Sequence, residues 1–235
     1  MTIFKLVLIT SVLISFFSCK EKKNIIEGME TCNTSEEKTP IKYLALGDSY
    51  TICHNVSEEG RWPNQLKDKL IENNFKVEKT DIIAQTGWTT SNLITVVNNA
   101  TPENYNLVSL LIGVNNQFQN QPFSIFQTEF DQLLTTSINI AGNKERVFVV
   151  SIPDYGVTPF GSGNSQTIGQ EIDQYNAYME TKCNSLNILY INITEISRTL
   201  GSSNGALTND NLHPSASQYT EWVNEILPEV LELLD

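Results

Sequence analysis

A serine stands directly after a short apolar segment at 43–46, within Gly47-Asp48-Ser49-Tyr50. Where a buried strand passes into a helix, a serine hydroxyl can be exposed at the edge of the sheet. The backbone N–H of that serine then lies at a helix N-terminus, where developing negative charge is stabilised. These properties suit a nucleophile, but Asp48 or Ser49 could equally serve only to cap the helix.

The chain contains two histidines, so an imidazole base must be His54 or His213. Asp210 precedes His213 by three residues in the segment 210–214. In a tight turn the carboxylate can reach the Nδ1–H of the ring, which leaves Nε2 to face a nucleophile. His54 lacks such an orienting group and lies in a polar segment, where we expect it to be exposed. The pattern therefore favours His213 as the base and Asp210 as its partner.

Two more positions after predicted strands offer hydrogen-bond donors. Gly87 can bring its backbone N–H close to a reacting oxygen because it has no side chain, and Asn115 offers a side-chain amide. Together with the Ser49 N–H, they could stabilise a tetrahedral oxyanion, where each donor is worth about 3–4 kcal/mol. Taken singly, Gly87 could be a turn glycine and Asn115 a loop or capping amide. Their occurrence at successive strand ends favours catalysis.

The elements that must position these residues follow from the spacing of apolar side chains. Continuous apolar runs predict five strands, at 43–46, 81–84, 107–112, 146–152 and 188–193. Helical spacing predicts helices at 62–70, 125–138, 168–179 and 219–234. Uninterrupted apolar strands alternating with helices are typical of a parallel sheet covered on both faces. We expect an α/β fold with three α/β/α layers and a five-stranded parallel sheet, whose carboxyl-terminal edge carries the site.

Length, composition and charge restrict the possible functions. The 235 residues fit one domain, and 40% hydrophobic with 18% charged residues is typical of a globular protein. The net charge of −12 argues against a nucleic-acid partner, because few basic residues are available to neutralise phosphates. Cys32, Cys53 and Cys183 allow one disulfide but make no metal cluster. We expect no metal or other cofactor, and the sequence indicates no oligomeric state.

The N-terminal segment reads as a targeting signal. Lys5 precedes an apolar run, from Leu6 to Phe17, that is too short to cross a bilayer. Ser18 followed by Cys19 resembles a bacterial lipobox, which implies a cleaved signal peptide at 1–18 and lipidation of Cys19; an ordinary cleaved signal is the alternative. Residues 19–40 are polar and predict a flexible tether. We expect an extracytoplasmic protein of the bacterial cell envelope, anchored to the membrane by lipid.

The motif blocks together resemble those of the SGNH (GDSL-type) hydrolases. They are the tetrapeptide at 47–50, Gly87, the Gly-x-Asn ending at Asn115, and the Asp-x-x-His ending at His213. The resemblance covers residues 41–235 and implies a flavodoxin-like fold, serine esterase activity and no cofactor. It also implies Ser49 as nucleophile, Asp210 and His213 as its partners, and Ser49, Gly87 and Asn115 as oxyanion donors. Asn116 departs from the family pattern, in which many members carry Asp, and this puts the support of that loop in question.

Aromatic residues near the strand ends are candidates for the substrate pocket: Trp88, Tyr155 and Phe160, with Trp62 as readily a core residue. Aromatic faces suit sugar rings as well as acyl chains. We therefore expect a small-molecule or glycan ester substrate with a short acyl group, which could be an O-acetyl group of a polysaccharide. A lysophospholipase or thioesterase acting on lipids, an acyltransferase and a tethered binding module without chemistry are the alternatives.

A second serine motif could be mistaken for a nucleophile motif. Residues 201–205, Gly-Ser-Ser-Asn-Gly, fit the G-x-S-x-G pattern of α/β-hydrolases. That motif requires a strand before it and a helix after it. Here it lies in a polar, glycine-rich stretch close to His213, so we expect a flexible loop.

Overall fold

The structure is a computed structural model that describes residues 39–235, so the predicted signal peptide, Cys19 and nearly all of the predicted tether lie outside the described residues. Its sheet has five strands in the order β2-β1-β3-β4-β5, and every neighbouring pair is parallel. The strands are β1 (Ile41–Gly47), β2 (Val77–Ala84), β3 (Leu107–Leu111), β4 (Val147–Val150) and β5 (Leu189–Ile191). This is the flavodoxin-like order, and it confirms the predicted five-stranded parallel sheet.

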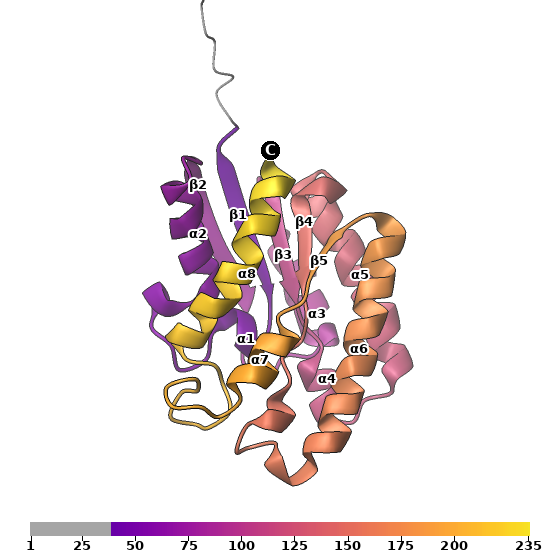
Figure 1. Cartoon of the computed structure of the whole chain (residues 1–235). Coiled ribbons are helices and arrows are strands. Elements are labelled where there is room, and N and C mark those ends of the chain that lie inside the picture. The colour runs from indigo at the N-terminus through magenta and orange to yellow at the C-terminus, as the bar shows by residue number, and fades with distance from the viewer. Residues whose placement is uncertain (1–38) are drawn as a thin grey trace, which may run out of the picture. The chain divides into compact units, whose positions relative to one another are not determined.

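Helices cover both faces of the sheet and complete three layers. They are α1 (Ser49–Ile52), α2 (Trp62–Glu72), α3 (Thr90–Ala100), α4 (Val114–Phe118), α5 (Phe123–Ala141), α6 (Ser165–Leu186), α7 (Thr194–Leu200) and α8 (Ala216–Leu234). Helix α2 packs against α8, while α3 packs against α5 and α5 against α6. Figure 1 shows α2 and α8 in front of the sheet and α3 and α5 behind it. The predicted α/β/α architecture is therefore confirmed.

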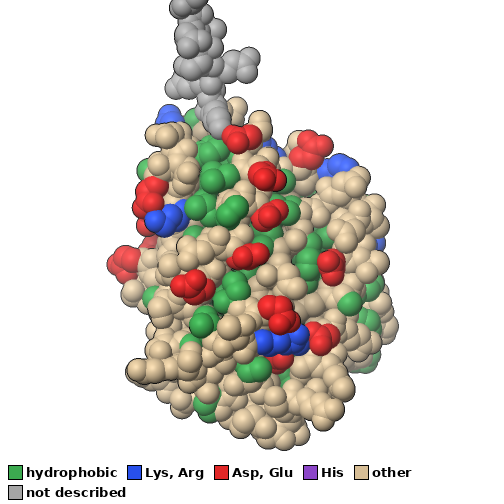
Figure 2. Space-filling view, viewed as in Figure 1, with side chains coloured by type: hydrophobic (Ala, Val, Ile, Leu, Met, Phe, Trp, Pro, Cys, Tyr) green, Lys and Arg blue, Asp and Glu red, His purple; other side chains and the backbone are tan. Residues whose placement is uncertain are grey.

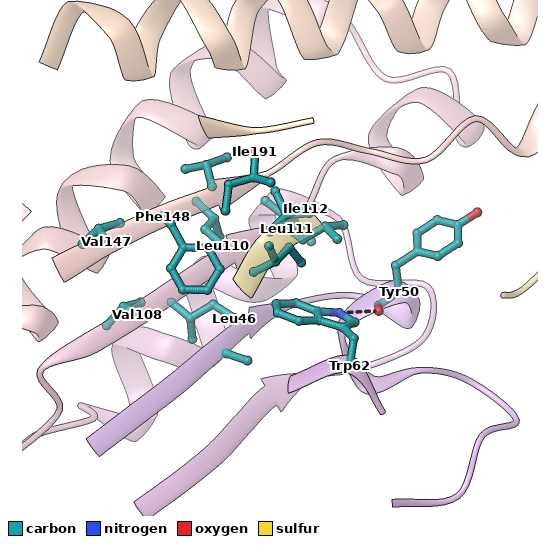
Figure 3. Close-up of a cluster of buried hydrophobic side chains, with 14 of the residues drawn as sticks. Leu46, Tyr50, Trp62, Val108, Leu110, Leu111, Ile112, Val147, Phe148 and Ile191 are labelled. Carbon is teal, nitrogen blue, oxygen red and sulfur yellow. Dashed lines mark hydrogen bonds between the residues drawn. The ribbon is translucent and has the colours of Figure 1, made fainter. Parts of the chain in front are cut away.

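The core explains why the strands read as unbroken apolar runs. The side chains of β3 and β4 are fully buried between the helical layers, and burying each large aliphatic group contributes about 1.5–3 kcal/mol. Figure 3 shows this cluster together with Trp62 and Tyr50. The Trp62 ring is fully buried, and its Nε1 donates a hydrogen bond to the Tyr50 carbonyl at 3.1 Å. Trp62 therefore belongs to the core and not to the pocket.

Gly47 lets the chain turn from β1 into α1 at the end of the sheet. A Cβ at this position would lie 2.1 Å from Thr51 Oγ1 and 2.3 Å from the Leu111 carbonyl oxygen. No other residue fits that space without moving the backbone. The close approach of β1, α1 and β3 fixes where Ser49 emerges.

Cys53 and Cys183 are buried free thiols, so no disulfide joins them, and Cys32 lies outside the described residues. Across residues 39–235, none of the helices has the length and apolarity to cross a bilayer. On the face shown in Figure 2, acidic side chains outnumber basic ones, in keeping with the net charge of −12. The surface is suited to attract cations more than anions.

Candidate active site

Ser49 is the first residue of α1, directly beyond the carboxyl end of β1. Asp48 is the N-cap, and its carboxylate accepts a hydrogen bond from the Tyr50 N–H at 3.0 Å. Because Asp48 caps the helix, the Ser49 hydroxyl is not needed for capping, and the N–H of a first helical residue has no acceptor within its helix. Both groups remain available at the edge of the sheet.

Ser49 lines a cavity of about 230 Å³ at the switch point of the sheet, where β1 is flanked by β2 and β3. The other predicted residues that line it are Gly87, Asn115, Tyr155, Phe160 and His213. Side chains that the sequence had not singled out complete the lining: Tyr50, Thr86, Val114, Phe118 and Leu212. In flavodoxin-like sheets ligands bind at this switch point. The structure thus brings the predicted nucleophile, base and donors to one cavity.

Asp210 holds the ring of His213 in place. Its Oδ2 lies 2.7 Å from His213 Nδ1, while its Oδ1 accepts the backbone N–H groups of Leu212 and His213, each at 2.9 Å. The Thr208 hydroxyl also donates to Oδ1 at 2.8 Å. The tight turn predicted from the three-residue spacing is therefore formed. The carboxylate can only accept when ionised, so the proton of this hydrogen bond is on Nδ1 and Nε2 is left as the basic nitrogen.

The two members of this pair have shifted pKa values. Partial burial by itself raises the pKa of Asp210, but the hydrogen bonds from His213, Leu212 and Thr208 outweigh it and hold the pKa well below its usual range. Burial lowers the pKa of His213 below its ordinary value of 6.5, and the bond to Asp210 offsets only part of this effect. Near neutral pH the pair therefore consists of a carboxylate and a neutral imidazole, which can act as a base.

His54 is not the exposed loop residue that the sequence suggested. It is half-buried, its ring centroid lies 4.8 Å from that of His213, and its Nδ1 lies 2.9 Å from Thr86 Oγ1. The neighbouring Asn55 donates through Nδ2 to Asp210 Oδ2 at 2.8 Å. The turn after α1 brings both residues back to the site, since Cys53 and Asn55 have left-handed backbone conformations. The sequence offered only weak signals of this return: an asparagine at a turn and the second histidine.

Gly87 and Asn115, the other two predicted oxyanion donors, are positioned by different structural features. Gly87 has a φ of +86°, a conformation that favours glycine, and nothing lies within 4 Å of a Cβ built there. Backbone conformation, and not lack of space, therefore selects glycine. Asn115 belongs to the short helix α4 and not to a loop, and its Nδ2 donates to the Trp88 carbonyl at 2.9 Å. That bond leaves the second hydrogen of the amide free to serve another acceptor.

Trp88, which the sequence offered as a pocket residue, does not line the Ser49 cavity. Its half-buried ring packs against the hydrophobic core, and the lining of the cavity does not include it. The contact of Trp88 with the site is through its carbonyl, which accepts the Asn115 amide. Tyr155 and Phe160 do line the cavity.

Asn116 supports the segment whose stability the sequence had put in question. Its side chain is fully buried, its Oδ1 accepts the Thr90 N–H at 3.0 Å, and its Nδ2 donates to Thr90 Oγ1 and Gln121 Oε1. The amide thus ties α4 to the start of α3. In this chain the amide of Asn116 supports the segment, at the position where the family pattern often has Asp.

Phe118 is the main pocket residue that the sequence missed. Its ring is 51% exposed and lies 6.2 Å from that of Tyr155 and 6.0 Å from that of Phe160, which is 53% exposed. Because the rings of Tyr155 and Phe160 also lie 6.4 Å apart, the three rings together form one aromatic wall of the cavity. A phenylalanine after the Gly-x-Asn motif, three positions beyond Asn115, was the available signal.

The second serine motif lies in a loop, as predicted. Residues 201–205 follow α7 and precede an isolated bridge between Leu207 and Pro214, with no strand before them. Both serines of the motif are exposed and neither lines the Ser49 cavity. The strand-turn-helix geometry of a nucleophile elbow is missing from this part of the described chain.

The sequence profile of the GDSL-like lipase/acylhydrolase family matches residues 45–220, which is more than half of the chain. The chain belongs to this family. Membership makes it a carboxylic ester hydrolase, as its motif blocks predicted. No curated protein matches the chain.

Several solved structures share the fold of this acylhydrolase at low sequence identity. TesA is 14% identical with a TM-score of 0.63, over 82% of this chain and 99% of its own. Axe2, an acetylxylan esterase from Geobacillus stearothermophilus, is 17% identical with a TM-score of 0.63, over 83% and 95%. The psychrotrophic esterase EstA from Pseudoalteromonas sp. is 17% identical with a TM-score of 0.58, over 82% and 98%. These similarities establish the fold.

Proposed function

We propose that this acylhydrolase is a serine esterase in which Ser49 is the nucleophile, His213 the general base and Asp210 the group that orients it. The observation that carries the proposal is the 2.7 Å hydrogen bond from His213 Nδ1 to Asp210 Oδ2, on a ring that lines the same cavity as Ser49. It leaves His213 Nε2 to accept the proton of the serine hydroxyl.

The reaction then proceeds through an acyl-enzyme. Ser49 Oγ attacks the ester carbonyl carbon while its proton passes to His213 Nε2, and the carbonyl oxygen becomes an oxyanion. The N–H groups of Ser49 and Gly87 and the Nδ2 of Asn115 stabilise this charge. The C–O bond breaks and His213 protonates the leaving alcohol. Water, giving a proton to His213, then attacks the acyl-enzyme and releases the carboxylic acid and Ser49.

A short acyl group is the substrate that the cavity favours. Its volume of about 230 Å³ is below the roughly 300–1,000 Å³ of pockets that enclose drug-sized ligands. The aromatic wall of Phe118, Tyr155 and Phe160 gives an apolar contact for an acyl group or a sugar face. The similarity to the acetylxylan esterase supports acetyl esters of polysaccharides as substrates.

A lipid acyl hydrolase is the second candidate, because the half-exposed rings of Phe118 and Phe160 extend apolar surface beyond the cavity. A hydrolysis panel of acetylated sugars, short nitrophenyl esters and long-chain lysolipids separates the two. Acyl transfer uses the same residues with a hydroxyl acceptor in place of water, and mass spectrometry of products formed with a polyol present detects it.

The experiment that tests the proposed nucleophile is the hydrolysis of nitrophenyl acetate by Ser49→Ala. We expect its turnover to fall to the background rate, because the attacking hydroxyl is gone. Ser203→Ala, in the exposed loop, is the matched control and should keep the parental rate. A Ser49→Ala protein with near-parental activity contradicts the proposal.

We also propose that Cys19 carries a lipid that anchors the enzyme to the extracytoplasmic side of a bacterial membrane. The support is the apolar segment from Leu6 to Phe17, followed by Ser18 and Cys19. Metabolic labelling with an alkyne fatty acid should mark the chain and leave Cys19→Ser unmarked. Equal labelling of both proteins contradicts the anchor.

A further inference from the structure

The two histidines of this chain meet, although only one of them is needed for the proposed reaction. His54 and His213 lie in different loops, yet their ring centroids are 4.8 Å apart and the ring planes are inclined by 55°. Asp210 lies beside both. One ligand atom from each of the three residues lies within 4.8 Å of the other two. Imidazole nitrogens are ligands that Zn²⁺ prefers, and a carboxylate beside them can orient a ligating ring.

Each ring is oriented as a metal-binding histidine usually is, through its second nitrogen. Thr86 Oγ1 lies 2.9 Å from Nδ1 of His54, and Asp210 Oδ2 lies 2.7 Å from Nδ1 of His213. Metal-ligating histidines typically make such a bond to an oxygen, which fixes the ring and its tautomer. Within residues 39–235, no hydrogen bond occupies the Nε2 of either ring. Both free nitrogens are therefore available to one ion.

Access and charge also suit a cation. His213 lines the cavity that contains Thr86 and Ser49, and His54 and Asp210 are only half-buried, so an ion can reach them from solvent. The net charge of −12 raises the local concentration of cations around the protein. Zn–N distances of about 2.0–2.1 Å lie within reach of two rings this close after small side-chain shifts.

We propose that Zn²⁺ binds between His54 and His213 through their Nε2 atoms, with Asp210 orienting the second ring and water completing the coordination, and that this ion reversibly inhibits the esterase. The lone pair with which His213 accepts the Ser49 proton is then bound to zinc, so the hydroxyl cannot be deprotonated. The inhibitory effect rests on the proposed function, whereas binding of the ion does not. The ion is an inhibitor here and not a cofactor.

The test combines direct binding with inhibition in the full-length chain. Isothermal titration with ZnCl₂ should give one site per chain, and hydrolysis of nitrophenyl acetate should fall as that site fills and return when EDTA is added. His54→Gln should weaken the zinc affinity more than tenfold relative to the parent. The zinc concentration that halves its activity, measured against its own rate in metal-free buffer, should rise by more than tenfold as well. Ser57→Ala, an exposed residue of the same loop, is the matched control and should bind zinc as the parent does.

Two further variants keep the outcomes distinct. Ser49→Ala should bind zinc with parental affinity even though it has no turnover, so a failure of the esterase proposal leaves the zinc site testable. Thr86→Val keeps both histidines but removes the anchor of His54, and should weaken zinc binding several-fold, which decides the matter if His54→Gln does not fold. Parental zinc affinity in both His54→Gln and Thr86→Val, or no zinc binding by the parent, overturns the proposal.

Discussion

Two aspartates near the Ser49 cavity have opposite environments. Asp48 is completely buried at the turn between β1 and α1, and its Oδ2 has no hydrogen-bond partner within residues 39–235. Asp210 is about a quarter exposed and accepts hydrogen bonds from Asn55, Thr208, Leu212 and His213. Burial raises the pKa of Asp48 to about 7, although the Tyr50 N–H opposes this, whereas the pKa of Asp210 lies below its usual range. Complete burial at Asp48, against hydrogen bonds that outweigh partial burial at Asp210, decides which carboxylate stays charged.

The two aspartates lie in regions with different roles, the β1–α1 turn and the loop that carries Asp210. The β1–α1 turn is buried and closely packed at Gly47 and Asp48, so it holds Ser49 in place. The loop that carries Asp210 is closed by the Leu207–Pro214 bridge and by hydrogen bonds to its own backbone, and it holds a charge next to His213. Substitutions in the first region should affect folding, and those in the second should affect catalysis.

Asp210→Asn should cause the largest loss. The amide can no longer hold the Nδ1–H tautomer or stabilise a protonated His213, so we expect kcat/KM to fall by roughly 10²–10⁴-fold with little change in melting temperature. Steady-state hydrolysis of nitrophenyl acetate measures this. Asp68→Asn, which removes an exposed carboxylate from α2, is the matched control. A parental rate in Asp210→Asn would contradict the catalytic role that separates Asp210 from Asp48.

Neighbouring asparagines extend the comparison. Asn115→Ala should lower kcat by roughly 10²–10³-fold while KM changes little, because the donor acts on the oxyanion and not on the bound ester. Asn116→Ala should instead destabilise the fold, since it leaves the buried Thr90 N–H unpaired, at about 1–3 kcal/mol for an unsatisfied group, while the Thr90 hydroxyl keeps its bond to Glu129. Kinetics and urea unfolding of both variants separate the roles. Equal kinetic effects in the two would contradict this assignment.

Asp48 should make stability depend on pH. Its pKa is about 7 in the folded chain against an ordinary 3.8, so between these values the folded state binds more protons than the unfolded state. Stability should therefore fall as pH rises from about 4 to 7, by an amount on the order of a few kcal/mol, and then level off. Asp48→Asn should lose this slope. Urea unfolding at several pH values measures it, and identical slopes in parent and variant contradict the raised pKa.

The smallest predicted effect is the position of the acid limb of the pH–rate profile. His213 must be neutral to accept a proton, and its pKa is lowered, so kcat/KM should stay on its plateau below pH 6.5 and decline only under more acidic conditions. The measurement needs a chelator in all buffers, so that metal binding does not distort it. A limb centred above pH 6.5 would show that the bond to Asp210 outweighs burial.

Local sequence signals were sufficient for most of the sheet and the motif blocks. Strands β1, β3 and β4 are buried on both faces, so they read as unbroken apolar runs, and Asp210 and His213 are close enough in the chain for a turn to join them. Edge strand β2 begins at Val77, before the predicted segment 81–84. Its first residues are partly exposed and show no apolar pattern, so the sequence did not reveal them as part of the strand. Helix α3 was missed since its capping box uses Asn92 in place of the usual Glu or Gln.

The sequence did not predict the positions of Trp88, His54 and Asn55, for a different reason. Trp88 follows a glycine with a positive φ, and the approach of His54 to His213 depends on two left-handed residues after α1. These are tertiary consequences of single backbone angles, which neither composition nor periodicity reveals. The same holds for Asn55, which meets Asp210 only in the folded chain.

Labelling with a nitrophenyl alkylphosphonate, followed by mass spectrometry of the digested protein, tests the nucleophile most directly. The account predicts one adduct, on Ser49, that forms rapidly in the folded chain and is lost in Ser49→Ala. An unlabelled folded chain would favour a binding module without chemistry, and an adduct on Ser202 or Ser203 would move the reaction to another site; either result contradicts the account.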